Sequence, residues 1–372
     1  MRSWLLGHLV CPVCGAALQW TGFERDAEHL MEGALRCAGC SMWYPVTGGV
    51  PRLVPPDLRQ EATLEFRRRF ETKLRAMGLD GDSTADSTPR PSSTDGLSGV
   101  KAHTLQNFGF EWTRYSRHGW DDPKYNIASE EEVFRYKSLV EPSEFAGKLV
   151  LDAGCGNGRY TYWATRYGGR VIGVDLTQAV DAAFQNTRDV ESAGIVQADL
   201  FHLPFRAEAF DVAFSIGVLM HTGDAHGAFL SVARHLRKGG SFTAHLYGVG
   251  NAVYEWMDRT IRERTTRLSI PELRTLTGRL YRIARWTDRI GLRSVVTCFV
   301  RLDDHPHCIF DWYAAPVASH HTYAEVEQWY AEAGFRVERT NRSFASSVPV
   351  KRFVMRLLRY PWPVTVRGVR LA

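Results

Sequence analysis

The strongest constraint on the fold is a run of short apolar segments that alternate with helical stretches from residue 148 onward. The segments predicted as strands are residues 148–153, 170–175, 194–198, 210–217 and 241–247, and helices are predicted at residues 159–167, 178–189 and 225–237. Strands that alternate with helices form a parallel sheet with helices on both faces. The sequence therefore predicts an α/β domain, in which Gly239 and Gly240 end the last of these helices and lead into the next strand.

A glycine-rich turn separates the first predicted strand from the first helix. Gly154, Gly156 and Gly158 let the backbone approach a ligand closely at this turn. Their spacing differs from the G-x-G-x-x-G pattern of dinucleotide sites, which disfavours NAD. Asp175, at the end of the second strand, can accept both hydroxyls of a ribose. Asp199, after the third strand, can accept an adenine amino group.

Residues 147–247 resemble the class I S-adenosylmethionine-dependent methyltransferases. The motifs are Asp152-x-Gly154-Cys155-Gly156-x-Gly158, Gly173-Val174-Asp175, Ala198-Asp199-Leu200, Phe210-Asp211 with Ser215 to His221, and Leu236 to Gly240. The resemblance implies a Rossmann-like, doubly wound sheet of seven strands and an enzyme that transfers a methyl group. It also implies cofactor contacts: the three glycines and Asp152 at the methionine part, Asp175 at the ribose, Leu176, Asp199 and Leu200 at the adenine, and Ile216 and Gly217 behind the sulfonium.

Four cysteines near the N-terminus form two C-x-x-C pairs, Cys11 with Cys14 and Cys37 with Cys40. This spacing is typical of a closed structural zinc site, and a reducing cytoplasm disfavours the alternative of disulfides or a redox pair. Residues 1–56, with Tyr44-Pro45-Val46 and Gly49-Val50-Pro51, resemble the zinc-ribbon domain of the activator subunits that partner tRNA and protein methyltransferases.

The sequence divides into five parts. They are a zinc ribbon (1–56), a helix and flexible linker (57–100), the first part of the methyltransferase domain with an N-terminal cap (101–250), an arginine-rich helical lid insertion (251–301), and the last part of the domain with a basic tail (302–372). The lid holds 11 Arg against 5 acidic residues, a net charge of +6, whereas the whole chain carries +5. Such a lid favours an anionic acceptor, although a solvated amphipathic helix has the same pattern.

Candidates for the transfer chemistry lie on both sides of the predicted cofactor site. A base that accepts the acceptor's proton is expected among His221, Asp311, His245 and His320, for which a structural role is the alternative. Arg135 is the candidate partner of the methionine carboxylate. An aromatic run at residues 107–115 is similar to a Phe-Gly-x-Glu-Trp stretch of some bacterial methyltransferases and is expected either to close the site or to pack in the core.

The expected acceptor is a small molecule, natural product or glycan, with O-methylation favoured, and this expectation rests on the Asp311-Trp312-Tyr313 segment and the lid. The alternatives are an RNA methyltransferase whose ribbon and basic lid hold phosphate, and a cofactor-binding partner protein without catalysis. Ser215-Ile216-Gly217-Val218 stands where enzymes that methylate amino groups carry Asn-Pro-Pro-Tyr, which argues against an adenine amino group as the methyl acceptor.

No apolar run reaches the roughly 18 residues of a membrane span. We expect a cytoplasmic protein, and the oligomeric state stays open.

Overall fold

The computed structural model describes residues 1–79, 116, 117, 120, 130–342 and 353–372, apart from residues 27, 55–57, 59, 60, 304 and 354. The aromatic run at 107–115 and all but the first two residues of the predicted linker at 78–99 lie outside these residues. None of the described helices is long and apolar enough to cross a membrane.

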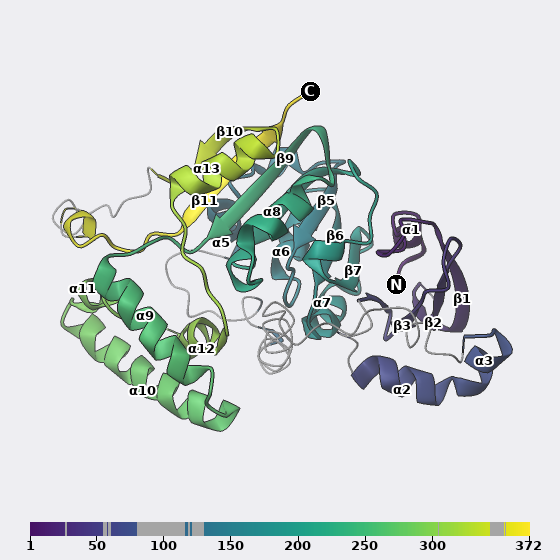
Figure 1. Ribbon diagram of the computed structural model, residues 1–372, viewed down its shortest axis with the longest axis horizontal. Helices are drawn as coiled ribbons and strands as arrows, with labels where there is room; N and C mark the ends of the chain where they lie inside the picture. The colour runs from purple at the N-terminus through teal and green to yellow at the C-terminus, as the bar shows by residue number, and fades with distance from the viewer. Residues whose placement is uncertain are drawn as a thin grey trace.

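A sheet in the order β7-β6-β5-β8-β9-β11-β10 forms the centre of the molecule (Figure 1). Its parallel strands are β5 (Leu149–Ala153), β6 (Arg170–Asp175), β7 (Ala193–Ala198), β8 (Phe210–Ile216) and β9 (Leu236–Leu246). β11 (Val364–Arg370) runs antiparallel to both β9 and β10 (Phe335–Thr340). The predicted seven-stranded, Rossmann-like sheet is confirmed, and the basic tail supplies one of its strands.

Helices cover both faces of this sheet because alternate residues of each strand point to opposite sides. Val150, Val171 and Phe214 pack with the residues of α5 (Glu130–Ser138) and α6 (Arg159–Arg166). On the other face, Leu151 and Ile172 belong to the same core cluster as the residues of α8 (Ala225–Ala233) and α13 (Tyr323–Glu332). α7 (Ala179–Thr187) packs on Ile195 of β7, and a short 3-10 turn at Pro142–Glu144 leads into β5.

The start of β9 differs from the prediction. Helix α8 already ends at Ala233, and β9 begins at Leu236, before the two glycines that were expected to join them. Leu236 pairs with Phe210 of β8, and the register shifts between that pair and the next one. Gly239 takes a φ of +74°, and a Cβ on Gly240 would lie within 3.0 Å of the Asp211 carbonyl oxygen. The glycines therefore serve an irregularity inside the strand rather than a helix end.

The zinc-ribbon segment extends the central sheet. It contains α1 (Ser3–Leu6), β1 (Leu18–Arg25), β2 (Leu30–Cys37), β3 (Trp43–Thr47) and β4 (Val50–Leu53). β4 pairs in parallel with β7, so the described strands form one sheet of 11 strands. Arg52, 3% exposed, donates to the Gln197 side chain at 3.2 Å and pairs with Asp181 at 2.5 Å. The ribbon is thus docked on the catalytic domain of its own chain, a point that the sequence left open.

The helix predicted at 57–77 is broken into α2 (Glu61–Arg69) and α3 (Glu71–Ala76). The break falls at Phe70, whose φ of −111° and ψ of 20° leave the helical region. Phe66, Phe70 and Leu74, spaced four residues apart, still pack together against Trp43 of β3.

The insertion after β9 folds into helices at one end of the molecule (Figure 1). These are α9 (Ala252–Thr265), α10 (Ile270–Arg289) and α11 (Arg293–Thr297), followed by α12 (Pro306–Ala314). Leu273 and Ala284 of α10 share a core cluster with Ile309 and Tyr313 of α12. A capping box of Ser269 and Glu272 starts α10.

Candidate functional site

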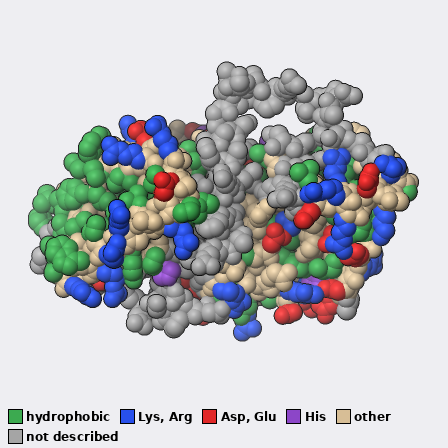
Figure 2. Space-filling model, turned by 90° about the horizontal axis from the view of Figure 1, so that it is seen from below, with side chains coloured by type: hydrophobic (Ala, Val, Ile, Leu, Met, Phe, Trp, Pro, Cys, Tyr) green, Lys and Arg blue, Asp and Glu red, His purple; other side chains and the backbone are tan. Residues whose placement is uncertain are grey.

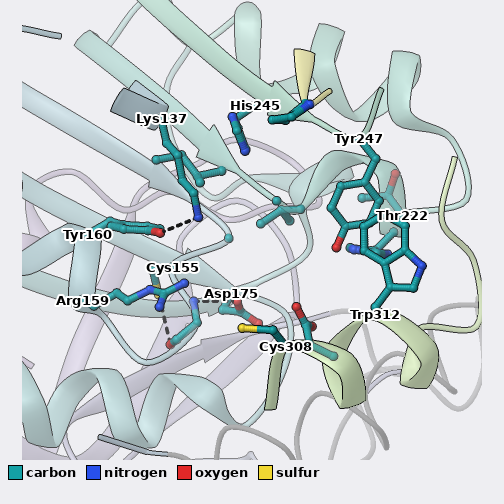
Figure 3. A pocket seen from close by; sticks show the side chains of 18 of the residues that line it. Lys137, Cys155, Arg159, Tyr160, Asp175, Thr222, His245, Tyr247, Cys308 and Trp312 are labelled. Atoms are coloured by element: carbon teal, nitrogen blue, oxygen red, sulfur yellow. Dashed lines mark hydrogen bonds between the residues drawn. The ribbon is translucent and has the colours of Figure 1, made fainter. Parts of the chain in front are cut away.

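A cavity of about 520 Å³ opens where the parallel strands end (Figure 3). Residues that directly follow β5, β6, β7 and β8 line it, as expected for a ligand site in an open α/β sheet. Of the predicted cofactor residues, it brings together Gly154, Gly156, Asp175, Leu176, Asp199, Leu200, Ile216 and Gly217. Asp152, Gly158 and Arg135 do not line it.

The glycine turn and Asp175 form one unit. The Gly156 N–H donates to Asp175 Oδ2 at 3.0 Å, and the backbone N–H and hydroxyl of Thr177 donate to Oδ1 at 2.9 and 2.8 Å. Burial raises the pKa of Asp175, while these donors oppose that shift. A Cβ on Gly154, where φ is +93°, would lie 2.3 Å from a Val218 methyl group. The turn therefore needs glycine at this position, and the fixed carboxylate faces the cavity beside it.

Two predicted residues support this turn from behind. Asp152 is buried and accepts a hydrogen bond from the Thr161 hydroxyl at 2.6 Å, which ties β5 to α6. Burial raises the pKa of Asp152 to about 7. Gly158 precedes α6, and a Cβ there would come within 3.1 Å of Ala183 of α7. Both positions shape the cavity wall without reaching its surface.

The predicted adenine end lies after β7. Asp199 is 3% exposed and caps a 3-10 turn at Leu200–His202, because its side chain accepts a bond from the Phe201 N–H at 3.2 Å. Its second oxygen lies 3.1 Å from His202 Nδ1. Leu176 lines the same part of the cavity, and its carbonyl accepts a bond from Gln197 at 2.9 Å.

A lysine that the sequence analysis did not single out stands near the glycine turn. Lys137 of α5 lines the cavity and donates to the Tyr160 hydroxyl at 3.1 Å (Figure 3). The predicted Arg135 instead lies 47% exposed and pairs with Glu141 at 2.9 Å. Two residues along a helix are about 200° apart, so only one of them can face the cavity.

Aromatic rings form the wall opposite the glycine turn. Tyr247, just after β9, stacks on Trp312 of α12 with ring centroids 4.0 Å apart (Figure 3). The Trp312 indole donates to Asp258 at 2.7 Å, and Arg262 pairs with that carboxylate and donates to the Trp312 carbonyl at 2.6 Å. Arg301 lies over the Trp312 ring at 4.7 Å. The stack is therefore held in place by a buried ion pair.

His221 lies at the cavity beneath this wall. Its Nδ1 is 2.8 Å from the Val317 carbonyl oxygen, which can only accept, so Nδ1 carries the proton and Nε2 carries the lone pair. Burial lowers the pKa of His221 to about 4, and the neutral imidazole meets Tyr247 edge to face at 5.3 Å. The imidazole that lines the cavity is therefore neutral, with its proton on Nδ1.

The other candidate bases are placed differently. His245 lines the cavity, but its Nδ1 bonds to the Thr365 hydroxyl at 2.7 Å, and burial lowers its pKa to about 3. Asp311 of α12 lines the cavity as well. His320 does not line it and pairs with Glu255 at 2.6 Å.

Further cavity residues had no local signal in the sequence. They lie on the segment before β11 and at the end of the lid: Tyr360, Pro361, Trp362, Pro363 and Arg301.

The predicted metal ligands form a compact cluster. The Sγ atoms of Cys11, Cys14, Cys37 and Cys40 all lie within 4.8 Å of one another. The Cys11–Cys40 and Cys14–Cys37 separations are 3.8 and 3.4 Å. Ligands about 2.3 Å from a tetrahedral zinc ion lie about 3.8 Å apart. The N–H groups of Gly39 and Cys40 point at Cys37 Sγ at 3.2 and 3.3 Å, which suits a thiolate. The donor set therefore fits a zinc ion.

The strand order, the glycine turn and the half-buried carboxylate of Asp175 at the end of β6 together define a class I methyltransferase. Residues 151–244 match the family model described as a methyltransferase domain, and residues 5–49 match the Trm112p-like protein model. The chain belongs to the S-adenosylmethionine-dependent methyltransferases, with a Trm112-like ribbon at its N-terminus.

Relatives align over much of the chain. The tRNA U34 carboxymethyltransferase of Vibrio atlanticus is 25% identical over 241 residues, which cover 61% of this chain and 72% of the relative. The enzyme of that name from Marinobacter nauticus is 30% identical over 246 residues, 64% of this chain and 67% of the relative. A chain in the solved complex of the Haloferax volcanii Trm112 methyltransferase activator is 17% identical, with a TM-score of 0.43, over 71% of this chain and 98% of that one.

These relatives correct the expected acceptor. A small molecule, natural product or glycan was favoured from the Asp311-Trp312-Tyr313 segment and the lid. That expectation is wrong, because relatives that align over about two thirds or more of their length are named for tRNA and the ribbon matches the Trm112p-like model. In the structure, Trp312 and Tyr313 are also core residues of the lid, which explains this segment without a small-molecule acceptor.

Proposed function

We propose that this chain is an S-adenosylmethionine-dependent methyltransferase that modifies a nucleoside of tRNA. The observation that carries the proposal is the aromatic and basic wall of the cavity, read together with the tRNA-directed relatives. A nucleobase that leaves its stack is held by aromatic faces, and its phosphates are held by arginine. The end of the cavity that faces the glycine turn is lined by groups of these kinds: Tyr247 and Trp312, which stack on each other, and Arg301, which lies over Trp312.

The positive charge of the lid supports a polyanionic acceptor. Arg264, Arg267 and Arg274 are exposed around the turn that joins α9 and α10. Exposed arginines bind phosphates and release counterions, so such binding weakens as salt rises.

Different residues of the chain would bind different parts of the cofactor. Asp175 would accept the ribose hydroxyls, Asp199 and Leu200 would meet the adenine, and the turn at Gly154 and Gly156 would hold the methionine part. Lys137, rather than Arg135, would pair with the methionine carboxylate. When bound, the cofactor supplies a methyl group made electrophilic by its sulfonium. The protein aligns the acceptor and excludes water.

His221 is the proposed base. It lines the cavity, and the Val317 carbonyl oxygen holds Nδ1 as the donor, so Nε2 is the nitrogen that would act as the base. It would accept the proton from an acceptor that gains a methyl group. The cysteine cluster is proposed to hold structural zinc, which keeps the ribbon folded and has no open ligand position for chemistry.

The acceptor can be tested directly. Purified protein, methyl-labelled S-adenosylmethionine and total tRNA from a strain that lacks the gene would be incubated, digested to nucleosides and analysed by mass spectrometry. Parallel reactions would use ribosomal RNA, protein and the metabolite fraction. We expect label in one tRNA nucleoside, sensitive to ribonuclease and strongly reduced with Asp175→Asn. Label confined to the metabolite or protein fraction would overturn the proposal, and the mass of the labelled nucleoside would identify the methylated product.

A further inference from the structure

Exposed apolar side chains gather at the α11 end of the lid. Figure 2 shows hydrophobic side chains crowded at this end of the molecule, with Lys and Arg side chains beside them. We call this surface the lid-end patch. It consists of Val249, Val253, Trp256, Ile283, Trp286, Ile290, Leu292, Val295, Phe353 and Leu357. Proteins in water seldom leave so many large apolar groups together without a function.

The patch combines segments that are far apart in the chain. Asn251, at the start of α9, donates through its side-chain amide to the Cys298 carbonyl after α11 and to the Leu358 carbonyl, both at 2.7 Å. These bonds join the α9 start, the α11 end and the turn that bears Phe353 and Leu357. α11 also packs on α10. The exposed side chains therefore belong to one end of a fixed helical unit.

Helix α10 presents two parallel stripes. Ile283, Trp286 and Ile290 follow one another at spacings of three and four, so they lie along one line of the helix. Arg282, Arg285 and Arg289 repeat the same spacing one residue earlier, and all six side chains are exposed. The opposite face of α10, with Leu273 and Ala284, is buried against α12. An apolar stripe bordered by arginines on a helix already packed by its other face is the pattern of a helix that lies in a membrane interface.

We propose that the lid-end patch rests on a membrane surface that contains anionic lipids. Trp256, Trp286 and Phe353, between 62% and 67% exposed, suit the boundary between headgroups and acyl chains. Arg282, Arg285 and Arg289, joined by exposed Arg356 and Arg359 beside Leu357, complement negative headgroups.

Other occupants fit less well. An RNA gains nothing from the aliphatic side chains, which neither stack on bases nor bind phosphate. A second copy of this face would bring one arginine-rich surface against another. On the described lid segment 251–301 the exposed acidic residues are only Glu263, Glu272 and Asp288, against exposed arginines at 259, 264, 267, 274, 279, 282, 285 and 289.

Vesicle flotation of the full-length protein tests the proposal. The probes are phosphatidylcholine vesicles with and without phosphatidylglycerol, each at low and high salt. We expect flotation with the anionic vesicles, weakened by salt, and a loss of about tenfold or more in partitioning for the double variant Trp256→Ser with Trp286→Ser. Arg282→Gln with Arg285→Gln is expected to weaken binding to the anionic vesicles only. The matched control is Leu64→Ser with Leu371→Ser, which removes exposed leucines (53% and 55%) outside the patch and is expected to float like the parent.

Several outcomes would overturn the proposal. These are no flotation with either vesicle, flotation that the tryptophan variant retains, a dimer in solution that this variant dissociates, or tRNA binding that this variant alone loses. Because neither tryptophan lines the cavity, the test does not depend on the proposed tRNA acceptor. Unchanged binding of S-adenosylhomocysteine by each variant would show that the fold is intact.

Discussion

At the scale of single residues, Asp175 is a cavity carboxylate whose position is fixed before any ligand binds. Asp175 receives donors from Gly156 and Thr177, so its orientation does not depend on a partner in the cavity. We expect Asp175→Asn to weaken S-adenosylhomocysteine binding by about thirtyfold, because a hydrogen bond to a charged acceptor is worth about 2 kcal/mol. Isothermal titration calorimetry measures this change. Asp224→Asn, at the exposed cap of α8, is the control, and an unchanged affinity of Asp175→Asn would contradict the assignment.

His221 is expected to act on turnover rather than on cofactor affinity. His221→Asn keeps a donor for the Val317 carbonyl but removes the basic nitrogen. General-base contributions suggest a fall of about 100-fold or more in kcat. Methyl transfer to tRNA under saturating cofactor gives kcat, and calorimetry gives the affinity for S-adenosylhomocysteine, which should stay the same. His226→Asn, at an exposed pair with Glu332, is the control. A matching loss in both quantities would assign His221 to binding.

At the scale of elements, the ribbon forms part of the catalytic sheet. Leu53 of β4 lies opposite Ala198 of β7, one residue before Asp199. Loss of metal should therefore expose the edge of β7 and loosen the adenine end of the cavity. We expect Cys40→Ser, or chelation of the parent, to lower Tm and to raise amide exchange in residues 193–200. Restored zinc should reverse the effect of chelation but not that of the substitution. Unchanged amide exchange in β7 after metal loss would mean that the ribbon does not stabilise this strand.

The sequence predicted those elements whose signals are local. The strand-end motifs and paired cysteines identified β5 to β9 and the thiol cluster, because a turn or a metal knuckle is specified by adjacent residues. The β4–β7 pairing and the residues at 360–363 depend on segments distant in the chain. The sequence analysis missed Lys137 because a choice between Arg135 and Lys137 requires knowing which side of α5 faces the cavity. The correct acceptor class also needed information beyond the residues, since one fold serves many acceptors.

At the scale of the whole molecule, the sheet is the common support of two attached parts. The ribbon covers the edge of β7, which would otherwise present unpaired backbone groups. The lid follows β9 in the chain, on the side of the sheet away from the ribbon. Asp258, Arg262 and Trp312 link the lid to the cavity wall. A substitution that loosens the sheet is therefore expected to destabilise both the ribbon and the lid.

Buried histidines make the stability of the whole molecule sensitive to acid. Burial lowers the pKa of His221 and His235 to about 4 and that of His245 to about 3, from an ordinary value of 6.5. Between these values the unfolded chain binds protons that the folded chain does not, so each histidine makes the free energy of unfolding fall as pH drops below 6.5. Asp152 opposes them, since its folded pKa of about 7 lies above the ordinary 3.8.

His235 is the histidine best suited to test this balance, because it lies outside the cavity and its Nδ1 donates to the Ser231 carbonyl at 2.8 Å. His235→Gln keeps a donor and cannot titrate. We expect it to lose less stability than the parent between about pH 7 and about pH 5, with the difference on the order of 1.4 kcal/mol for each unit by which pH falls below 6.5. Urea unfolding at both pH values measures this. Parallel losses in parent and variant would show that His235 is protonated in the folded state.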